Sequence, residues 1–475
     1  MEPERLLPSR VRPDPSSEPV DRRSRVLLLG AIVLLCAVVV ILGAVGDERS
    51  PPTSRETNAS IGNTTPETGY ALENNTTGTL SAGNTLITVQ THDWFGTNSG
   101  EALIVAPNGT TIWSYDPPNS RVFDAEVTSN DTILLSFATE LTGEDCPSAY
   151  RSGAEESCVH NRVVELDPAD NTVVWEYDWY DAFIAHHEVH DADRLDDGQT
   201  AIIDMGNNRA FTVNRDGEIT WSWNATDHLS TESAFQEQYG GLPQEHSEAD
   251  WTHMNDIDQL PNGNFQLSIR NFDVVLEVDP RTNDIVNVIG KPGDTSTLNQ
   301  QHNPQRLDND TILVADSENH RVVEIDTDTE ELQWLYDGPS DRGLQWPRDA
   351  DRLPNGNTLV TDSRNFRVLE IDSEGQVVWR HSLRDSRGIV YEADRLGVPE
   401  ESATGLTHSD NTTIDPTHPL ITRIQSIESW AGFVFPGWVR LQELVAILCG
   451  VFAGLGLLWQ FTIGWLRGDR LLYWK

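Results

Sequence analysis

Four side chains that can bind an anion or move a proton occupy one position of a repeated pattern. The position lies five residues before the leucine that begins each copy: it holds His190 before Leu195, Asn255 before Leu260, His302 before Leu307 and Arg348 before Leu353. A position that served folding alone should hold similar residues in every copy, whereas this one alternates between imidazole, amide and guanidinium groups. We therefore interpret the four residues as a ring around one mouth of an axial channel.

Further candidates lie where the repeat departs from its own pattern. Three histidines precede one copy, namely His186, His187 and His190. His253 stands before the next copy, and Arg270 follows it at a register that holds a different kind of residue elsewhere. The other copies have Met205, Ser317 or Ser363 there, so the scaffold does not require an arginine. The regularly repeated arginines, Arg209, Arg321 and Arg367, are instead expected to pair with acidic residues of the same or the next copy.

These residue types suit the transfer of an anionic group. A neutral imidazole is a good nucleophile toward electrophilic sulfur or phosphorus, which makes His302 the predicted nucleophile. The transferred group spreads negative charge over three oxygens, and arginine and asparagine donors on rigid strands can bind them. A second histidine can exchange a proton with the leaving and attacking oxygens. In the alternative interpretation, His302 is a structural loop histidine, and His253 and Arg270 pair with nearby acids.

The combination of His253-Met254-Asn255, Arg270 and Gln301-His302, in this order, resembles the arylsulfate sulfotransferase family. The resemblance rests on spacing and repeat order and covers roughly residues 85–379. It implies an extracytoplasmic six-bladed β-propeller enzyme, here a membrane-anchored member of haloarchaeal type, that uses no nucleotide donor and no other cofactor. It also implies small-molecule partners, because such enzymes pass a sulfuryl group from an aryl sulfate to a phenol in two steps.

The resemblance suggests a role for each candidate. His302 matches the nucleophile that becomes a transient sulfohistidine, and His253, Asn255 and Arg270 match groups that bind the sulfuryl oxygens. One of the three clustered histidines matches the acid/base residue. All three compete for that one role; His186 is expected in an exposed loop, and His187 and His190 are the preferred candidates. Arg348 joins the substrate-binding residues because of its place in the ring.

Two other function classes remain open at this point. The run ILVADSENHRVVEID also looks like an NHL-type propeller repeat, whose members often bind partners without catalysis, here a partner on the cell surface. A propeller dehydrogenase that uses a quinone or a metal is the other alternative, although no cofactor platform is evident. Four aspartates share a register two residues before the leucine: Asp193, Asp258, Asp351 and Asp394. We interpret them as structural acceptors of backbone N–H bonds at blade starts, and we predict no metal site.

The elements that must position these residues are short alternating strands. Residues 301–326 and 348–372 are near copies of one strand–turn–strand unit, and looser copies occupy 190–221 and 255–279. A period of about 45 residues predicts an all-β propeller with one four-stranded sheet per repeat. The predicted blades cover residues 85–113, 121–175, 186–223, 251–290, 301–334 and 345–379. A fragment at Tyr391–Leu396 repeats the start of a blade and could close the ring; six blades are counted, with seven as the alternative.

Two apolar runs predict membrane helices on either side of the propeller. Residues 26–46 and 443–466 are long enough to cross a bilayer, and basic residues flank both on the side away from the propeller. We therefore predict a cell-membrane protein with an extracellular propeller and both termini in the cytoplasm. The predicted order is a cytoplasmic tail (1–25), a membrane helix (26–46), a glycosylatable stalk (47–84), the propeller (85–400), a linker with interfacial aromatic residues (401–442), a membrane helix (443–466) and a cytoplasmic tail (467–475).

The net charge and the cysteines indicate the environment and the partners of the protein. The chain has 33 Lys and Arg against 75 Asp and Glu, a net charge of −42, which suits a halophile's surface and argues against nucleic acid as a partner. Cys146 and Cys158 flank a polar insertion, and outside the cell they are expected to form one disulfide.

Overall fold

A computed structural model describes residues 26, 29–39, 79–92, 99–153, 156–182, 186–243, 250–308, 310–339, 343–383, 388–398 and 441–467. These residues divide into two units, the propeller and a pair of apolar helices near the two ends of the chain. The predicted stalk (47–84) and linker (401–442) lie outside the described residues, except for 79–84 and 441–442.

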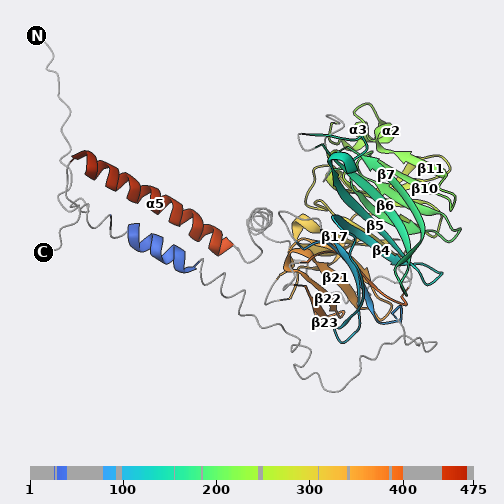
Figure 1. The fold of residues 1–475 in the computed structure, drawn as a ribbon. Helices are drawn as coiled ribbons and strands as arrows, with labels where there is room; N and C mark the ends of the chain where they lie inside the picture. Colours follow the sequence, from blue (N-terminus) through green and yellow to red (C-terminus); the bar gives the residue numbers. More distant parts are fainter. Residues whose placement is uncertain are drawn as a thin grey trace, which may run out of the picture. The chain divides into compact units, whose positions relative to one another are not determined.

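The propeller consists of six four-stranded antiparallel sheets, as the repeat predicts (Figure 1). The first sheet contains β24 (Ile389–Arg395), β1 (Thr85–Thr91), β2 (Glu101–Val105) and β3 (Thr111–Tyr115), and the second contains β4 (Ser120–Val127), β5 (Ile133–Thr142), β6 (Ser157–Asp167) and β7 (Thr172–Asp181). The third contains β8 (Val189–Arg194), β9 (Thr200–Asp204), β10 (Arg209–Val213) and β11 (Ile219–Asn224), and the fourth contains β12 (Met254–Gln259), β13 (Phe265–Ile269), β14 (Val274–Asp279) and β15 (Asp284–Gly290). The fifth contains β16 (His302–Asp308), β17 (Thr311–Asp316), β18 (Arg321–Asp326) and β19 (Leu332–Tyr336), and the sixth contains β20 (Pro347–Arg352), β21 (Thr358–Asp362), β22 (Arg367–Ile371) and β23 (Val377–Ser382).

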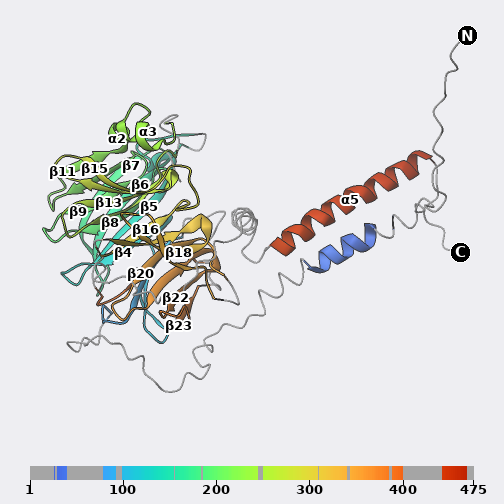
Figure 2. The same cartoon turned by 180° about the vertical axis from the view of Figure 1, so that it is seen from behind.

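The first sheet closes the ring. Its innermost strand, β24, comes from the C-terminal end of the propeller and pairs with β1 from the N-terminal end. The fragment Tyr391–Leu396 therefore does what its pattern indicated, and the count of six blades is confirmed. Two short helices, α2 (Ala225–His228) and α3 (Ala234–Tyr239), connect the third and fourth sheets (Figure 2).

The hydrophobic core is divided among the interfaces between neighbouring sheets. Each of the six interfaces has its own buried cluster. In the cluster between the fifth and sixth sheets, for example, Leu313 and Val360 are fully buried. Because this packing surrounds the axis and supports every sheet, side chains on the innermost strands have a rigid base.

A bulge interrupts each innermost strand near the same mouth of the axis. In β8, for example, Val189 pairs with Asp204 and Asp191 with Ile203, so His190 is an extra residue. The pairings of β4, β12 and β20 shift by one residue at the corresponding place. Those of β16 and β24 shift by one residue between His302 and Gln305 and between Val390 and Ala393. A regular strand sends adjacent side chains to opposite faces, whereas a bulge re-aims one of them. Two consecutive residues of each innermost strand can therefore face the axial space.

The second unit has one candidate membrane span among its described residues, where the sequence predicts two. Of the described helices, α5 (Leu441–Arg467) is the one long and apolar enough to cross a membrane, through Val445–Ile463 with a mean hydropathy of 1.9. In the first apolar run the described helix covers Leu29–Val39, and most of the remaining run lies outside the described residues. One candidate membrane helix, near the C-terminus, is what the structure supports.

Candidate active site

The four predicted ring residues lie together at the bulged mouth, and two aromatic residues complete the ring. The six positions, one per sheet, are Phe123, His190, Asn255, His302, Arg348 and Tyr391. The ring centroid of Tyr391 lies 5.9 Å from that of His190 and 6.0 Å from that of His302. The Arg348 guanidinium carbon lies 4.8 Å from the centre of the Tyr391 ring. Residues more than 200 positions apart in the chain thus share one small site.

His302 is held in one tautomer by its surroundings. Its Nδ1 lies 3.2 Å from the carbonyl oxygen of Gln300 and 2.8 Å from Oγ of Ser317. A carbonyl can only accept, so Nδ1 carries the proton and Nε2 keeps its lone pair. Burial, followed by the charges of Arg348 and Arg270, lowers the pKa of His302 well below its usual value. The imidazole is therefore neutral, with a nucleophilic nitrogen available.

His253 lies beside His190, and both are also neutral. The two ring centroids are 5.1 Å apart, and Nδ1 of His253 lies 2.8 Å from Oδ2 of Asp250. Burial, followed by the charge of Arg270, lowers the pKa of His253 to about 4. Burial, followed by the charge of His253, lowers the pKa of His190 well below its usual value. Because Asp250 accepts the Nδ1 proton, His253 can take a second proton at Nε2 and remain paired with a carboxylate.

His253 is displayed by a strained backbone. Its φ is 47°, in the left-handed region that non-glycine residues rarely adopt. Gln300 and Trp346, at the same distance before the ring residues of the next two sheets, have φ values of 51° and 56°. Three consecutive blades thus have a residue in the left-handed conformation two positions before the ring residue. Backbone strain of this kind concentrates at functional sites.

Three arginines surround the histidines. Arg270 donates to Oδ1 of Asn271 (2.8 Å) and to Oε1 of Gln300 (2.7 Å), and it begins a 3-10 turn just after β13. Arg348 donates to Oε1 of Gln90 on the ring-closing side (2.7 Å). Burial lowers the pKa of Arg348 to about 10.

The third arginine, Arg364, was not predicted. Its guanidinium carbon and that of Arg348 each lie 4.1 Å from the centre of the Trp346 ring. Burial lowers the pKa of Arg364 to about 9. Buried cations this close raise one another's energy, so the cluster is poised to bind an anion.

The remaining sequence candidates lie in varied surroundings. His186 is exposed, as expected. His187 is buried, with Nδ1 2.8 Å from Oδ1 of Asp181, and its ring packs on Gly206, where an added Cβ would come within 2.5 Å of it. Of this cluster, His190 is the histidine that the structure places in the ring. Asn255 donates from Nδ2 to the carbonyl of Gln301 (2.9 Å), which supports the backbone just before His302.

The regular repeat arginines form the expected pairs within their own hairpins. The pairs are Arg209 with Asp204 at 2.8 Å, Arg321 with Asp316 at 2.5 Å and Arg367 with Asp362 at 2.7 Å. The structure also contains the Cys146–Cys158 disulfide.

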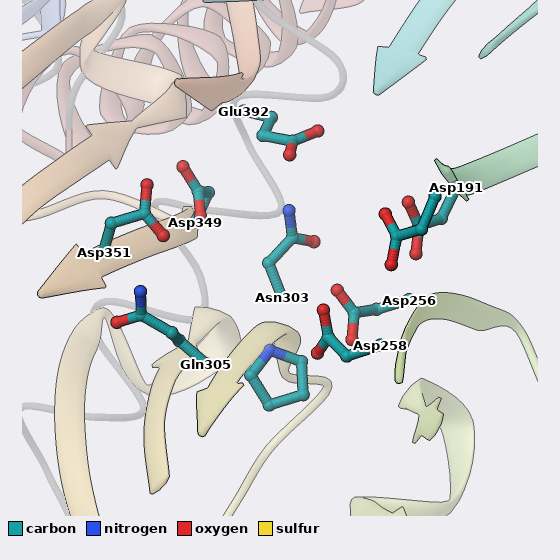
Figure 3. Close-up of a pocket in the computed structure, with 10 residues that line it drawn as sticks. Asp191, Asp256, Asp258, Asn303, Gln305, Asp349, Asp351 and Glu392 are labelled. Atoms are coloured by element: carbon teal, nitrogen blue, oxygen red, sulfur yellow. The ribbon is translucent and has the colours of Figure 1, made fainter. Parts of the chain in front are cut away.

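An acidic cavity follows the ring along the axis (Figure 3). It is lined by Asp191, Asp193, Asp256, Asp258, Asn303, Pro304, Gln305, Asp349, Asp351 and Glu392. The cavity is narrow, with room on the order of one water molecule. In Figure 3 the carboxylates of Asp349, Asp256 and Glu392 approach it from different blades. Among the described residues, no three His, Cys, Asp or Glu side chains are arranged to hold a metal ion.

Several of the cavity's carboxylates tie neighbouring blades together. Oδ2 of Asp191 accepts from the backbone N–H of Ile257 (2.5 Å), and Oδ2 of Asp349 accepts from that of Ala393 (2.9 Å). We predict this role for Asp193, Asp258, Asp351 and Asp394; Asp191 and Asp349, directly after the ring position, have it. The bulge turns the residue after the ring position inward beside its neighbour.

Tyr391 was not among the predicted site residues, although its distance from the following leucine identifies it. Tyr391 lies five residues before Leu396, the same spacing as the other ring residues. Arg364 and Trp346 have no such signal, because they lie in loops whose course the strand pattern does not predict.

Comparison with known proteins gives one family. The model of the arylsulfotransferase family matches residues 185–330, less than half of the chain. The matched range contains His190, His253, Asn255, Arg270 and His302. No curated protein matches the chain.

Solved structures align with the chain at low sequence identity and with TM-scores below 0.5. A protein of unknown function from Bacteroides caccae aligns at 16% identity and a TM-score of 0.46, over 66% of this chain and 98% of its own. An inactive virginiamycin B lyase variant from Staphylococcus aureus, solved with quinupristin, aligns at 11% identity and a TM-score of 0.38, over 66% and 89%. A structure of a nidogen/laminin complex aligns at 12% identity and a TM-score of 0.41, over 66% and 97%. The family match, carried on a six-bladed propeller, supports the arylsulfotransferase family and an enzyme of sulfotransferase type that acts on small molecules.

Proposed function

We propose that the chain moves a sulfuryl group from an aryl sulfate to a phenol, with His302 as the covalent carrier. The observation that carries this proposal is the state of His302. It is buried and neutral, with Nδ1 bound to a carbonyl oxygen and a lone pair left on Nε2. A histidine in this state, in the field of two arginines, can attack sulfur without first losing a proton.

In the first step, the lone pair on Nε2 of His302 attacks the sulfur of the aryl sulfate. A nitrogen–sulfur bond forms, the sulfur–oxygen bond to the ring breaks, and the phenolate leaves with the electron pair. Arg270 and Arg348 offset the negative charge on the sulfuryl oxygens and hold the group in line. Asn255 keeps the nucleophile's backbone in place through the Gln301 carbonyl.

In the second step, a phenol takes the place of the departed phenolate. His253, with a pKa of about 4, is unprotonated at neutral pH and can accept the phenol proton at Nε2. The phenol oxygen then attacks sulfur, and the nitrogen–sulfur bond returns its electrons to His302. Asp250 stabilises the imidazolium that forms, because it lies 2.8 Å from Nδ1. His190 is a second candidate base for the phenol proton, because its ring lies beside that of His253.

We further propose that the protein works at the outer face of a cell membrane. One apolar C-terminal helix that could anchor it supports this setting. An extracellular propeller with both termini in the cytoplasm requires the first apolar run (26–46) to cross the membrane as well. This topology, the glycosylated stalk and adaptation to high salt are parts of the same proposal, and they rest on the sequence pattern alone.

The test uses the full chain in detergent and high salt, with 4-nitrophenyl sulfate as donor and phenol as acceptor. We expect nitrophenolate release that depends on phenol, and its loss in His302→Ala. His160→Ala is the matched control, because His160 is paired with Asp178 on the outer strands of the second sheet. Digestion at alkaline pH after a donor-only incubation should give a His302 peptide that is heavier by one sulfuryl group.

The outcomes separate the parts of the proposal. Turnover that survives His302→Ala would keep the enzyme and move the nucleophile to another histidine. Absence of turnover with every phenol tried would refute sulfuryl transfer.

A further inference from the structure

Tyr391 carries a buried hydroxyl that has no partner in the described part of the chain. The residue is 1% exposed, and its Oη makes no hydrogen bond to any described residue. It belongs to β24, the strand that closes the ring, and lies outside the range matched by the family model.

The side chain lies at the axis between two regions of opposite charge. Its ring contacts His190 and His302, and its ring centroid lies 5.3 Å from that of Phe123. The hydroxyl interacts electrostatically with Arg348 at the mouth and with Asp191 and Asp256 of the acidic cavity. These residues come from three other sheets, so the hydroxyl reaches the centre of the ring.

The Tyr391 hydroxyl is protonated and neutral, which suits it to donate a hydrogen bond. Burial raises the pKa of Tyr391 well above its usual value, so the hydroxyl keeps its proton. Arg270 also lies within electrostatic range of the hydroxyl. A neutral donor beside two guanidiniums is suited to an oxygen that bears negative charge.

The packing of the aromatic side chains around the axis does not require a hydroxyl at Tyr391. Phe123 holds the same register in the adjacent sheet, is fully buried and contacts the same His190, with ring centroids 4.4 Å apart. An aromatic ring without a polar atom therefore suits this layer. A buried hydroxyl that stays without a partner destabilises the fold. This one lies beside the arginines of the site, so an anion bound there can accept its hydrogen bond.

We propose that the Tyr391 hydroxyl donates a hydrogen bond to an oxygen of the sulfuryl group bound at the mouth, beside Arg348 and Arg270. The inference rests on the proposed function for the identity of the anion. It makes the closing strand a direct contributor to the site. It also gives the aromatic layer of Tyr391, Phe123, His190 and His302 a second role, because this layer separates the bound anion from the acidic cavity.

The test compares Tyr391→Phe with Tyr336→Phe. Tyr336 is a matched control because its hydroxyl is also buried without a partner among the described residues, yet it lies on β19, packed between the fifth and sixth sheets. Binding of inorganic sulfate would be measured by calorimetry, and donor turnover would be followed with 4-nitrophenyl sulfate. A hydrogen bond to a charged group predicts a loss of roughly tenfold or more in sulfate affinity and in kcat/KM for Tyr391→Phe. Tyr336→Phe should leave both unchanged, and neither variant should melt at a lower temperature.

Each outcome bears on one proposal. If the wild type turns over and Tyr391→Phe matches it in rate and in sulfate affinity, the inference is overturned while the proposed function stands. If the wild type binds sulfate without turning over any aryl sulfate, and Tyr391→Phe weakens that binding, the donor role stands and the proposed reaction falls. Equal losses in both variants would also overturn the inference, since they would report a general effect of removing a buried hydroxyl.

Discussion

The contact between Ser317 and His302 gives the sharpest prediction for catalysis. Oγ of Ser317 lies 2.8 Å from Nδ1 of His302 and 2.6 Å from the carbonyl oxygen of Pro347. Because the serine donates to the carbonyl, its oxygen can accept the Nδ1 proton and keep the lone pair on Nε2. Ser317→Ala removes this acceptor but leaves the Gln300 carbonyl at 3.2 Å.

The expected loss is therefore partial. One neutral hydrogen bond contributes about 1 kcal/mol net, which corresponds to a roughly fivefold slower attack by His302. The sequence supplies a matched control in Ser363, which has the same register in the sixth sheet, is fully buried, and has an Oγ without a partner in the described residues. Ser363→Ala should leave the rate unchanged.

The assay is a stopped-flow measurement of the first release of 4-nitrophenolate, with single-turnover amounts of donor. The melting temperature of each variant would show whether the fold is retained. A rate within twofold of the wild type for Ser317→Ala would refute the orienting role. So would an equal slowing in Ser363→Ala. A complete loss in Ser317→Ala would also contradict the argument, because the Gln300 carbonyl should preserve the tautomer.

Two further predictions concern stability. Burial raises the pKa of Asp273 from 3.8 to about 6, so the folded state holds this proton more tightly than the unfolded chain does. The free energy of unfolding therefore falls by at most about 3 kcal/mol as the pH rises from 4 to above 6. Asp273→Asn keeps an acceptor for the N–H of Gln300, so we expect the variant to equal the wild type near pH 4 and to exceed it in denaturant unfolding at pH 7; equal stability at both pH values would contradict this. Replacing Cys146 and Cys158 by serine should lower the free energy of unfolding by about 2–3 kcal/mol, since the disulfide closes a short loop, while turnover stays unchanged; unaltered stability under oxidising conditions would be the contrary result.

The repeat explains why so much of the site could be predicted. In a propeller, equal sequence registers become equal heights around one axis, so counting back from each leucine brought His190, Asn255, His302 and Arg348 together without any knowledge of contacts. The same counting, extended to Leu396, reaches Tyr391.

The rest depended on local backbone geometry. Sequence alone left His187 and His190 as competing candidates, and the bulge in β8 is what turns His190 to the axis. The residues with left-handed backbone before the innermost strands, such as Trp346, do not share a residue type, so the sequence does not mark them. The contacts of Trp346 with two arginines could therefore not be anticipated. The first apolar run meets the length criterion for a span by composition, and its crossing of the membrane stays a prediction.

Ring closure by β24 sets the order of events during synthesis. A nascent chain that has emerged from the ribosome only as far as β23 has every innermost strand but one, and β1 still presents an unpaired edge. Until Ile389–Arg395 has been made, Arg348 also lacks its aromatic neighbour Tyr391. The complete ring of side chains at this mouth therefore forms only when the last strand of the propeller docks. A chain that stops early lacks part of the proposed site and is exposed to strand-to-strand aggregation.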